Sequence, residues 1–181
     1  MIIFMGVAGA GKSVQGTLLA EKLGYKWLST GEYLRANISG ELKEQMLAGK
    51  LLSDEQIIDI LKGFFESIGQ DNGVILDGFP RTLVQAKWLY ELHQNHKINI
   101  RDVIYLDASL KVVTERLLDR GRPDDTADVL GKRFEEYEKL TYPVVDWLKK
   151  QGLTVHTVNA EADVDEVQAE ILNRLSIDTD V

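Results

Sequence analysis

The chain has 181 residues, with 44% hydrophobic and 28% charged side chains and a formal net charge of -8 at pH 7. These values indicate one globular domain with a sizeable core. The acidic balance argues against nucleic acid as a partner, because proteins bind its phosphates mainly through Lys and Arg. The lack of cysteine excludes disulfides and thiolate zinc sites, and no run approaches the roughly 18 apolar residues of a membrane span. We therefore expect a cytoplasmic protein with no membrane partner.

Short apolar runs alternate along the chain with longer stretches in which apolar residues recur at helical spacing. The runs that predict buried strands are residues 2–7, 26–29, 74–77, 103–107 and 153–158. The stretches that predict helices are residues 12–24, 82–96, 109–120, 125–151 and 163–175. This alternation predicts an α/β fold of three layers, in which a five-stranded parallel sheet is flanked by helices.

Two stretches interrupt this alternation. Residues 31–60 contain short helical pieces separated by turn residues, which predicts a small helical insertion between the second and third strands. Residues 121–129 form a short charged loop between two predicted helices. The core domain would then consist of residues 1–30, 61–120 and 130–181.

A phosphate-binding loop is predicted directly after the first strand. Gly6, four further residues and then Gly11, Lys12 and Ser13 match the pattern G-x-x-x-x-G-K-[ST], between a predicted strand and a predicted helix. In such P-loop NTPase folds, backbone N–H groups and the helix N-terminus surround a phosphate, and the lysine reaches the outer phosphates. The alternative, a glycine-rich turn with an exposed lysine, does not account for both the spacing and the context. The sequence therefore predicts that a nucleoside triphosphate binds here.

Polar residues follow the third and fourth strands. Asp77 ends the third strand and is placed to hold hydrated Mg²⁺, whereas Asp107 is more simply a polar strand end. Arg81 and Gln85 lie four residues apart on the next predicted helix, and Arg35 lies on a short helix after the second strand. Since ligands of open parallel sheets bind beyond the carboxyl ends of the strands, both arginines should reach the crevice of the phosphate loop and grip a second phosphate.

Four of the eight arginines fall within residues 114–137. They are Arg116, Arg120, Arg122 and Arg133. A surface ion pair is the ordinary role of any single arginine. Their clustering in an acidic protein favours phosphoryl transfer instead, because that reaction needs cations around the moving group and a site closed to water.

Several segments in order resemble the adenylate kinase family of nucleoside monophosphate kinases, in its short-lid form. They are GVAGAGKS, LSTGEYLR, AGKLLSDE, ILDGFPRT, DRGRPDD, KRFEEY and VNAEADVDEV, of which DGFPRT is the most specific. The resemblance covers essentially the whole chain. It implies reversible transfer of a phosphoryl group from MgATP to AMP, giving two ADP, with residues 31–60 as the acceptor-binding subdomain and residues 121–129 as the lid.

The same resemblance implies the site residues. For ATP they are Gly9, Ala10, Gly11, Lys12, Ser13, Val14, Arg116 and Arg120. For AMP they are Thr30, Arg35, Leu52, Gly78, Arg81, Gln85, Arg122 and Arg133. The residues implied to act on the transferred group are Lys12, Arg81, Arg120, Arg122 and Arg133. Mg²⁺ would be held by Asp77 and Ser13, directly or through water.

The chain departs from the family pattern in two places. Family members commonly carry Gly and then Thr after the loop lysine, where this chain has Ser13 and then Val14, and the lid is very short. Ser13 can supply a hydroxyl to Mg²⁺ or phosphate, but Val14 cannot donate a side-chain hydrogen bond. We expect a monomer, although a second chain could help to close so short a lid.

Three other functions stay open at this point. A kinase for UMP, CMP or dTMP would share the fold and the phosphate loop. A non-catalytic sensor of adenine nucleotides is motivated by Val14 and the short lid. A P-loop kinase of a small metabolite is the third, and DGFPRT followed by glutamine argues against it.

Overall fold

The computed structural model describes residues 1–47, 52–68, 73–120 and 127–177. The strands are β1 (Ile2–Met5), β2 (Lys26–Ser29), β3 (Val74–Asp77), β4 (Asp102–Asp107) and β5 (Val155–Asn159). The helices are α1 (Lys12–Leu23), α2 (Thr30–Asn37), α3 (Gly40–Leu47), α4 (Asp54–Ile68), α5 (Leu83–Gln94), α6 (Leu110–Arg120), α7 (Ala127–Glu136), α8 (Tyr142–Lys150) and α9 (Val164–Arg174). A π-helical turn, η1 (Tyr137–Thr141), joins α7 to α8.

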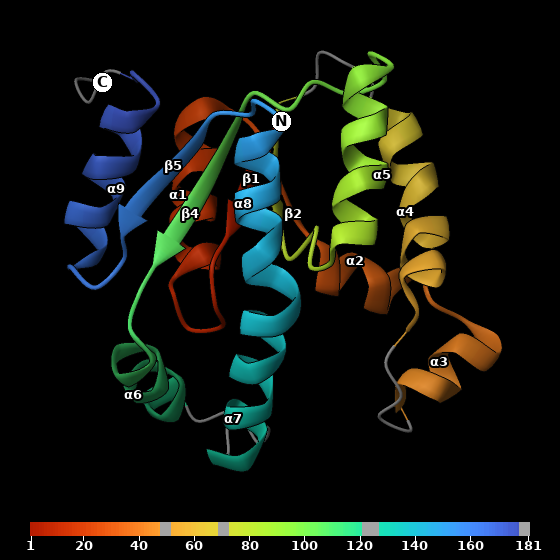
Figure 1. Ribbon diagram of the computed structural model, residues 1–181, viewed down its shortest axis with the longest axis horizontal. Coiled ribbons are helices and arrows are strands. Elements are labelled where there is room, and N and C mark those ends of the chain that lie inside the picture. Colours follow the sequence, from red (N-terminus) through yellow and green to blue (C-terminus); the bar gives the residue numbers. More distant parts are fainter. Residues whose placement is uncertain (48–51, 69–72, 121–126, 178–181) are drawn as a thin grey trace.

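The strands form one parallel sheet in the order β2-β3-β1-β4-β5 (Figure 1). β1 lies at its centre, with Phe4 opposite Asp77 of β3 and Ile104 of β4. The chain leaves β1 toward β2 on one side, whereas it leaves β3 toward β4 on the other. Neighbouring parallel strands whose connections diverge in this way open a crevice at their carboxyl ends. The topology therefore predicts a binding site beyond β1 and β3.

Helices cover both faces of the sheet, and side chains alternate between the two layers. Ile3 points into the buried cluster under α4, α5 and α8, whereas Ile2 and Phe4 point into the cluster under α1, α6 and α9. All three side chains are at most 1% exposed. A strand buried on both faces needs a continuous apolar run, which explains the sequence IIF. The predicted three-layer α/β fold with a five-stranded parallel sheet is confirmed.

The stretch from α7 to α8 is helical throughout, as the predicted helix 125–151 requires, but it contains η1 in its middle. Pro143 follows η1 and lies in the first turn of α8. Proline has no N–H for the carbonyl four residues earlier and its ring crowds that carbonyl, which accounts for a widened turn at this place. Figure 1 shows α8 in front of the sheet and α7 extending beyond its carboxyl edge.

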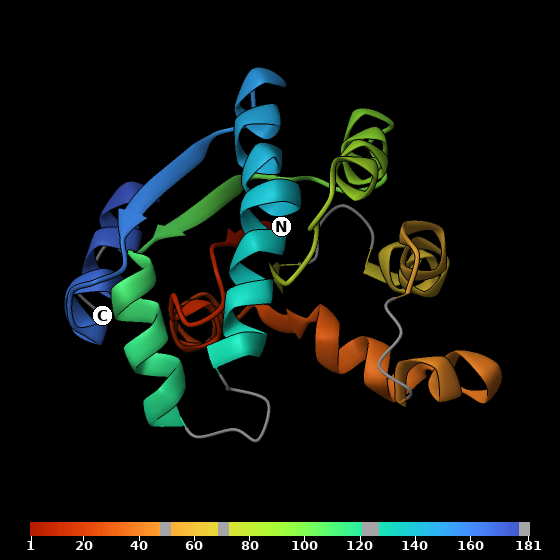
Figure 2. The ribbon, with the colours of Figure 1, turned by 60° about the horizontal axis from the view of Figure 1, so that its bottom comes forward.

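Two groups of helices project from the carboxyl edge of the sheet on opposite sides (Figure 2). One is α2 with α3, and the other is α6 with α7. The predicted insertion boundary at residue 60 falls inside α4, and residues 127–129 of the predicted lid begin α7. No helix in the described part of the chain is both long and apolar enough to cross a membrane.

Gly6 begins the phosphate loop where the chain leaves β1. Its φ is +146°, and a Cβ at this position would lie 2.6 Å from the carbonyl oxygen of Leu106 on β4. We expect Gly6→Ala to lower the free energy of unfolding by about 2–4 kcal/mol, because the clash is with backbone and the conformation is strained. Urea denaturation measures this change.

Gly63 provides the matched control, because it is exposed on α4 and a Cβ there meets nothing within 4 Å. Gly63→Ala should raise stability by about 0.5–1 kcal/mol, as alanine is the better helix former. Equal effects of the two substitutions would contradict the close approach of the loop to β4.

Candidate active site

The loop between β1 and α1 leaves backbone donors free at the start of α1. Gly11 is the N-cap with φ +91°, and no side chain caps this helix end. Within the loop, the N–H of Ala10 donates to the carbonyl of Val7 at 3.2 Å, which folds the chain back on itself. Uncapped N–H groups and the positive end of the helix dipole together attract an anion. The geometry is that of the phosphate loop predicted from sequence.

Lys12 lies across this loop. Its Nζ donates to the carbonyl oxygens of Gly6 and Val7, at 2.8 and 2.9 Å. Burial lowers the pKa of Lys12, and the nearby Arg81 lowers it further, while Asp77 opposes the shift. The ammonium group therefore lies close to residues from both loops of the crevice. An anion entering here would relieve the repulsion between Lys12 and Arg81.

Ser13 and Asp77 meet across the β1–β3 crevice. The Ser13 hydroxyl donates to Asp77 Oδ2 at 3.3 Å, and Asp77 is 8% exposed. Its other oxygen, Oδ1, is buried without a hydrogen-bond partner. An unpaired carboxylate oxygen beside a hydroxyl fits Mg²⁺ or its bound water. No group of three or more metal-binding side chains gathers among the described residues, so the ion would keep most of its ligands as water and phosphate.

Three residues of the predicted acceptor site lie together: Gly78 and Arg81 follow β3, and Thr30 begins α2. Arg81 Nε donates to the carbonyl of Gly78 at 2.8 Å. A Cβ built at Gly78 would lie 3.2 Å from Arg81 Nη2 and 3.8 Å from the Cβ of Thr30. Thr30 is 2% exposed, and its hydroxyl has no partner. Because buried polar groups are normally hydrogen-bonded, an unpartnered hydroxyl beside an arginine indicates that a ligand supplies the missing bond.

Gln85 is held in a network that sequence reasoning missed. Its Oε1 accepts from the N–H of Arg81 at 2.8 Å, and its Nε2 donates to Asp54 Oδ1 at 2.7 Å. The Thr82 hydroxyl donates to Asp54 Oδ2 at 2.9 Å. The spacing in the sequence predicted Arg81 and Gln85 on one helix face, but α5 begins at Leu83 with Thr82 as its N-cap, so Arg81 lies just before the helix. Asp54 lies in the AGKLLSDE segment, but no pattern in the sequence indicated its contact with Gln85, since the two residues come from different helices.

Two further predicted acceptor residues lie less close to this group. Arg35 is exposed on α2, and its guanidinium lies 3.5 Å from where a Cβ of Gly31 would stand. Leu52 is half-buried just before α4. The described contacts of these residues do not join them to Arg81, so their part in the site stays a prediction.

The predicted donor arginines have different surroundings. The Arg116 guanidinium donates to the carbonyls of Ala160, Glu161 and Ala162, at 2.7, 3.3 and 3.4 Å. It thereby fixes the loop between β5 and α9 against α6. Arg133 is half-buried on α7. Arg122 and the side chain of Arg120 lie outside what the structure describes.

Val14 and Thr141 border the crevice. Val14 is 51% exposed on the first turn of α1, so its apolar surface faces solvent. The Thr141 hydroxyl, on η1, donates to the carbonyl of Arg81 at 3.0 Å. This bond ties the helix that carries Arg133 to the segment that carries Arg81. No sequence pattern indicated this bond, because a bond from a side chain to the backbone across 60 positions leaves no periodic pattern.

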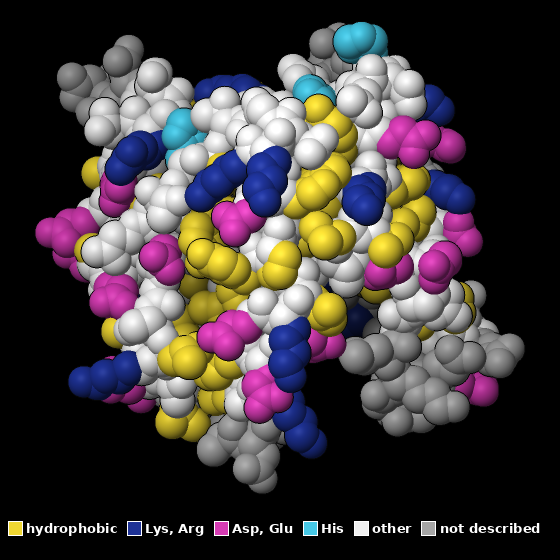
Figure 3. Space-filling model, in the orientation of Figure 1, with side chains coloured by type: hydrophobic (Ala, Val, Ile, Leu, Met, Phe, Trp, Pro, Cys, Tyr) yellow, Lys and Arg dark blue, Asp and Glu magenta, His cyan; other side chains and the backbone are white. Residues whose placement is uncertain are grey.

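The hollow between the two projecting groups of helices is visible on the surface. In Figure 3 the surface is indented between the lower end of α7 and the part of the chain that includes α3, and both basic and acidic side chains lie along the α7 side. The rim therefore carries mixed charge. The case for an anionic ligand comes from Lys12 and Arg81, which lie close enough to repel one another.

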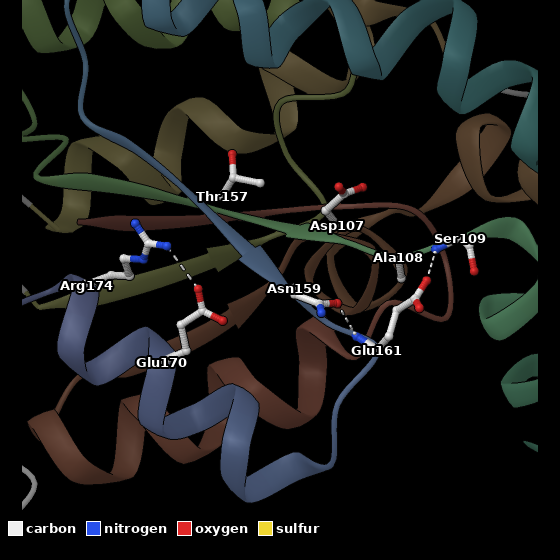
Figure 4. Close-up of a pocket in the computed structure, with 8 residues that line it drawn as sticks. All are labelled: Asp107, Ala108, Ser109, Thr157, Asn159, Glu161, Glu170 and Arg174. Atoms are coloured by element: carbon white, nitrogen blue, oxygen red, sulfur yellow. Dashed lines mark hydrogen bonds and ion pairs between the residues drawn. The ribbon is translucent and has the colours of Figure 1, made fainter.

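A separate pocket of about 510 Å³ opens at the ends of β4 and β5 (Figure 4). It contains the carboxylates of Asp107, Glu161 and Glu170, and its arginine, Arg174, is already paired with Glu170 at 3.2 Å. Such an excess of negative charge repels phosphate. Asp107 therefore lines this pocket, whereas Asp77 is the strand-end carboxylate that meets the phosphate loop.

Comparison with known proteins identifies the family. A model of the family described as adenylate kinase matches residues 4–153 of this chain. The chain belongs to the adenylate kinase family. Curated adenylate kinases similar to it include one from a Prochlorococcus marinus strain, 36% identical over 97% of this chain and 98% of that protein. Others come from Mycobacterium bovis, 37% identical over 96% and 98%, and Corynebacterium urealyticum, 34% identical over 91% and 94%.

Membership in the adenylate kinase family confirms the family and the enzyme class predicted from the sequence. The match begins in β1 and extends past α8, so it includes the phosphate loop, the DGFPRT segment and the arginines of α6 and α7. Adenylate kinases are phosphotransferases, and the crevice beyond β1 and β3 has the charged groups that phosphoryl transfer needs.

The shifted pKa of Lys12 predicts how stability depends on pH. Protonated Lys12 is less favourable in the folded chain than in the unfolded chain, whose lysine titrates near 10.5. Stability should therefore rise as the pH approaches 10.5 and the proton is lost. Lys12→Met removes this contribution, so the free energy of unfolding of the wild type, minus that of the variant, should increase as the pH rises toward 10.5.

Urea denaturation of both proteins across this pH range measures the difference. Lys111→Met removes an exposed lysine from α6 and controls for loss of a surface charge. A difference between wild type and Lys12→Met that does not change with pH would contradict the burial of the ammonium group.

Proposed function

We propose that the chain catalyses reversible phosphoryl transfer from MgATP to AMP, giving two ADP. The observation that carries the proposal is the meeting of Lys12, Asp77 and Arg81, which come from the phosphate loop and the DGFPRT segment and share one crevice. A phosphate loop alone is compatible with many nucleoside triphosphatases. The neighbouring segment after β3, with the exposed Arg81, would supply the place for a second phosphate.

ATP would bind at the start of α1. Backbone N–H groups there would surround its phosphates, with Lys12 leaving the carbonyls of Gly6 and Val7 to contact the transferred group. Arg116, fixed on the loop after β5, would support the adenine of ATP. The full set of donor residues proposed is Gly9, Ala10, Gly11, Lys12, Ser13, Val14, Arg116 and Arg120.

AMP would bind between α2, α4 and the segment after β3. Arg81 would hold its phosphate, and the unpaired hydroxyl of Thr30 and the amide of Gln85 would meet its base. The full set of acceptor residues proposed is Thr30, Arg35, Leu52, Gly78, Arg81, Gln85, Arg122 and Arg133. Residues 31–60 would serve as the acceptor subdomain and residues 121–129 as the lid, each moving against the core formed by residues 1–30, 61–120 and 130–181.

In the reaction, an anionic oxygen of the AMP phosphate attacks the terminal phosphorus of ATP while the bond from that phosphorus to the bridging oxygen breaks. No general base is needed, because the attacking oxygen carries no proton that must be removed. Lys12, Arg81, Arg120, Arg122 and Arg133 would stabilise the charge on the transferring group. Bound Mg²⁺ would offset the negative charge of the ATP phosphates, near Asp77 and Ser13.

The proposal includes the setting of this reaction. Phosphorylation of AMP to ADP is the step by which this monophosphate enters the pool of di- and triphosphates. We therefore assign the protein to nucleotide biosynthesis, and we place it in the cytoplasm. We expect it to act as a monomer, because the donor and acceptor groups named above all come from one chain.

The direct test is ADP formation by the purified protein from ATP, Mg²⁺ and AMP, with UMP, CMP and dTMP as parallel acceptors. Lys12→Ala controls for a contaminating kinase. Turnover with AMP that is lost in the control is expected. Folded protein that binds ATP and AMP but forms no ADP would contradict the proposal and favour a nucleotide sensor.

Arg81→Ala should lower kcat/KM for AMP by about 100-fold or more, because a charged contact in the transition state is lost. Arg174→Ala is the matched control, since Arg174 is exposed and its side chain pairs with its helix neighbour Glu170, away from the crevice. Steady-state kinetics of both variants measure kcat/KM for AMP. Near wild-type turnover in Arg81→Ala would exclude Arg81 from the site.

A further inference from the structure

Asp54, on the first turn of α4, fixes which way the amide of Gln85 points. We propose that Asp54 is a positioning residue that makes the acceptor site select adenine over 6-oxopurines. The inference rests on the proposed function, which puts the acceptor base against Gln85. It concerns a residue that touches the amide and not the base.

The hydrogen-bonding partners of the Gln85 amide determine which side of the amide is NH₂ and which is the carbonyl. A carboxylate only accepts hydrogen bonds, so the side of the amide that faces Asp54 Oδ1 at 2.7 Å is the NH₂ group. A backbone N–H only donates, so the side that faces Arg81 N at 2.8 Å is the carbonyl. In a flipped amide, the NH₂ group would face the N–H of Arg81, so two donors would meet. The carbonyl would face the Asp54 carboxylate, so two acceptors would meet.

The surroundings make such a flip costly. Gln85 is 2% exposed, so bulk water does not replace a lost partner. The second oxygen of Asp54 accepts from the Thr82 hydroxyl, which in turn accepts from the N–H of Gln85 at 3.2 Å. The carboxylate is therefore held at both oxygens, and its partner amide is held at both ends.

Helix capping does not explain this carboxylate. Ser53 and Gln56 cap α4 reciprocally: the N–H of Ser53 donates to Gln56 Oε1 at 2.9 Å, and the N–H of Gln56 donates to Ser53 Oγ at 3.3 Å. The side chain of Asp54 instead crosses from α4 to the N-terminus of α5. Its partners are 28 and 31 positions away in sequence.

The orientation has a consequence for base selection. A primary amide can make four hydrogen bonds, and Asp54 and Arg81 use one donor and one acceptor, which leaves one of each. Adenine offers an acceptor at N1 and a donor at its 6-amino group, whereas hypoxanthine offers a donor at N1 and an acceptor at O6. The two bases thus require opposite directions of the amide. Fixing the amide in one direction favours one base and rejects the other.

The test compares Asp54→Asn with the wild type, using AMP and IMP, whose bases differ at this edge. Asparagine is nearly the same size but can present either NH₂ or carbonyl to Gln85, so the amide loses one of its two constraints. We expect the AMP-to-IMP ratio of kcat/KM to fall by about tenfold and KM for AMP to rise, with KM for ATP unchanged. Calorimetric binding of AMP and IMP gives the same ratio without turnover.

Two further variants isolate the effect. Glu55→Gln removes an exposed carboxylate from the same helical turn and should leave the ratio unchanged. Asp54→Glu keeps a group that only accepts, so it should keep the preference for AMP even if folding of Asp54→Asn is impaired. Urea midpoints of all variants report whether α4 remains packed.

The outcomes separate the two hypotheses. Wild-type protein that binds AMP but does not form ADP contradicts the proposed function, while the AMP-to-IMP binding ratio still tests Asp54. An unchanged ratio in Asp54→Asn, or equal increases in KM for AMP and ATP, overturns the positioning role. Loss of AMP preference in Glu55→Gln to the same extent would also overturn it, because any charge in that turn would then serve.

Discussion

Phe4 on β1 lies opposite Asp77 on β3, and this parallel register determines where the two strands leave the sheet. Since the chain turns away in opposite directions after them, their loops diverge and the crevice between them is fixed by the sheet itself. A slip of one residue would turn the alternating side chains of β3 toward the wrong layer of helices. Burial of Ile75 and Leu76 in opposite clusters therefore also holds Asp77 beside Ser13.

The crevice holds positive charges close together, which destabilises the ligand-free protein. Lys12 and Arg81 repel one another, and burial adds to the cost of charging Lys12. The protein partly offsets this cost with Asp77 and with the two loop carbonyls that accept from Lys12. Phosphate would replace these weaker partners, and relief of the repulsion between Lys12 and Arg81 would then contribute to binding of an anionic ligand.

The sequence predicted what depends on short-range pattern. The apolar run of β1, the glycines and lysine of the phosphate loop and the helix end at Gly24, which adopts the left-handed conformation at the C-cap of α1, all have local causes. The strand order did not follow from the sequence, because β1 lies between strands that are distant along the chain. The π turn before Pro143 was also missed, since helical spacing looks similar on both sides of it.

The least predictable parts of the site are side chains that act on other polar groups. Asp54 bonds Gln85, Thr141 bonds the carbonyl of Arg81, and Arg116 bonds three consecutive carbonyls, each across 31 to 60 positions. The contacts of these residues leave no periodic pattern, and the AGKLLSDE segment around Asp54 does not indicate its partner. They are found only after folding brings their partners within hydrogen-bond distance.

These partners matter because charge alone does not distinguish one nucleotide from another. Every nucleoside monophosphate would present the same phosphate to Arg81 in the proposed site, so the arginine would contribute to affinity for all of them. Discrimination between bases must come from neutral donors and acceptors that are buried away from water and held in a fixed direction. The buried amide of Gln85 meets that requirement, because a carboxylate and a backbone N–H hold its two ends. The Thr30 hydroxyl has no such partner and can rotate to suit either base. In the proposed site, selectivity would thus depend on a residue of α4, one contact removed from the substrate.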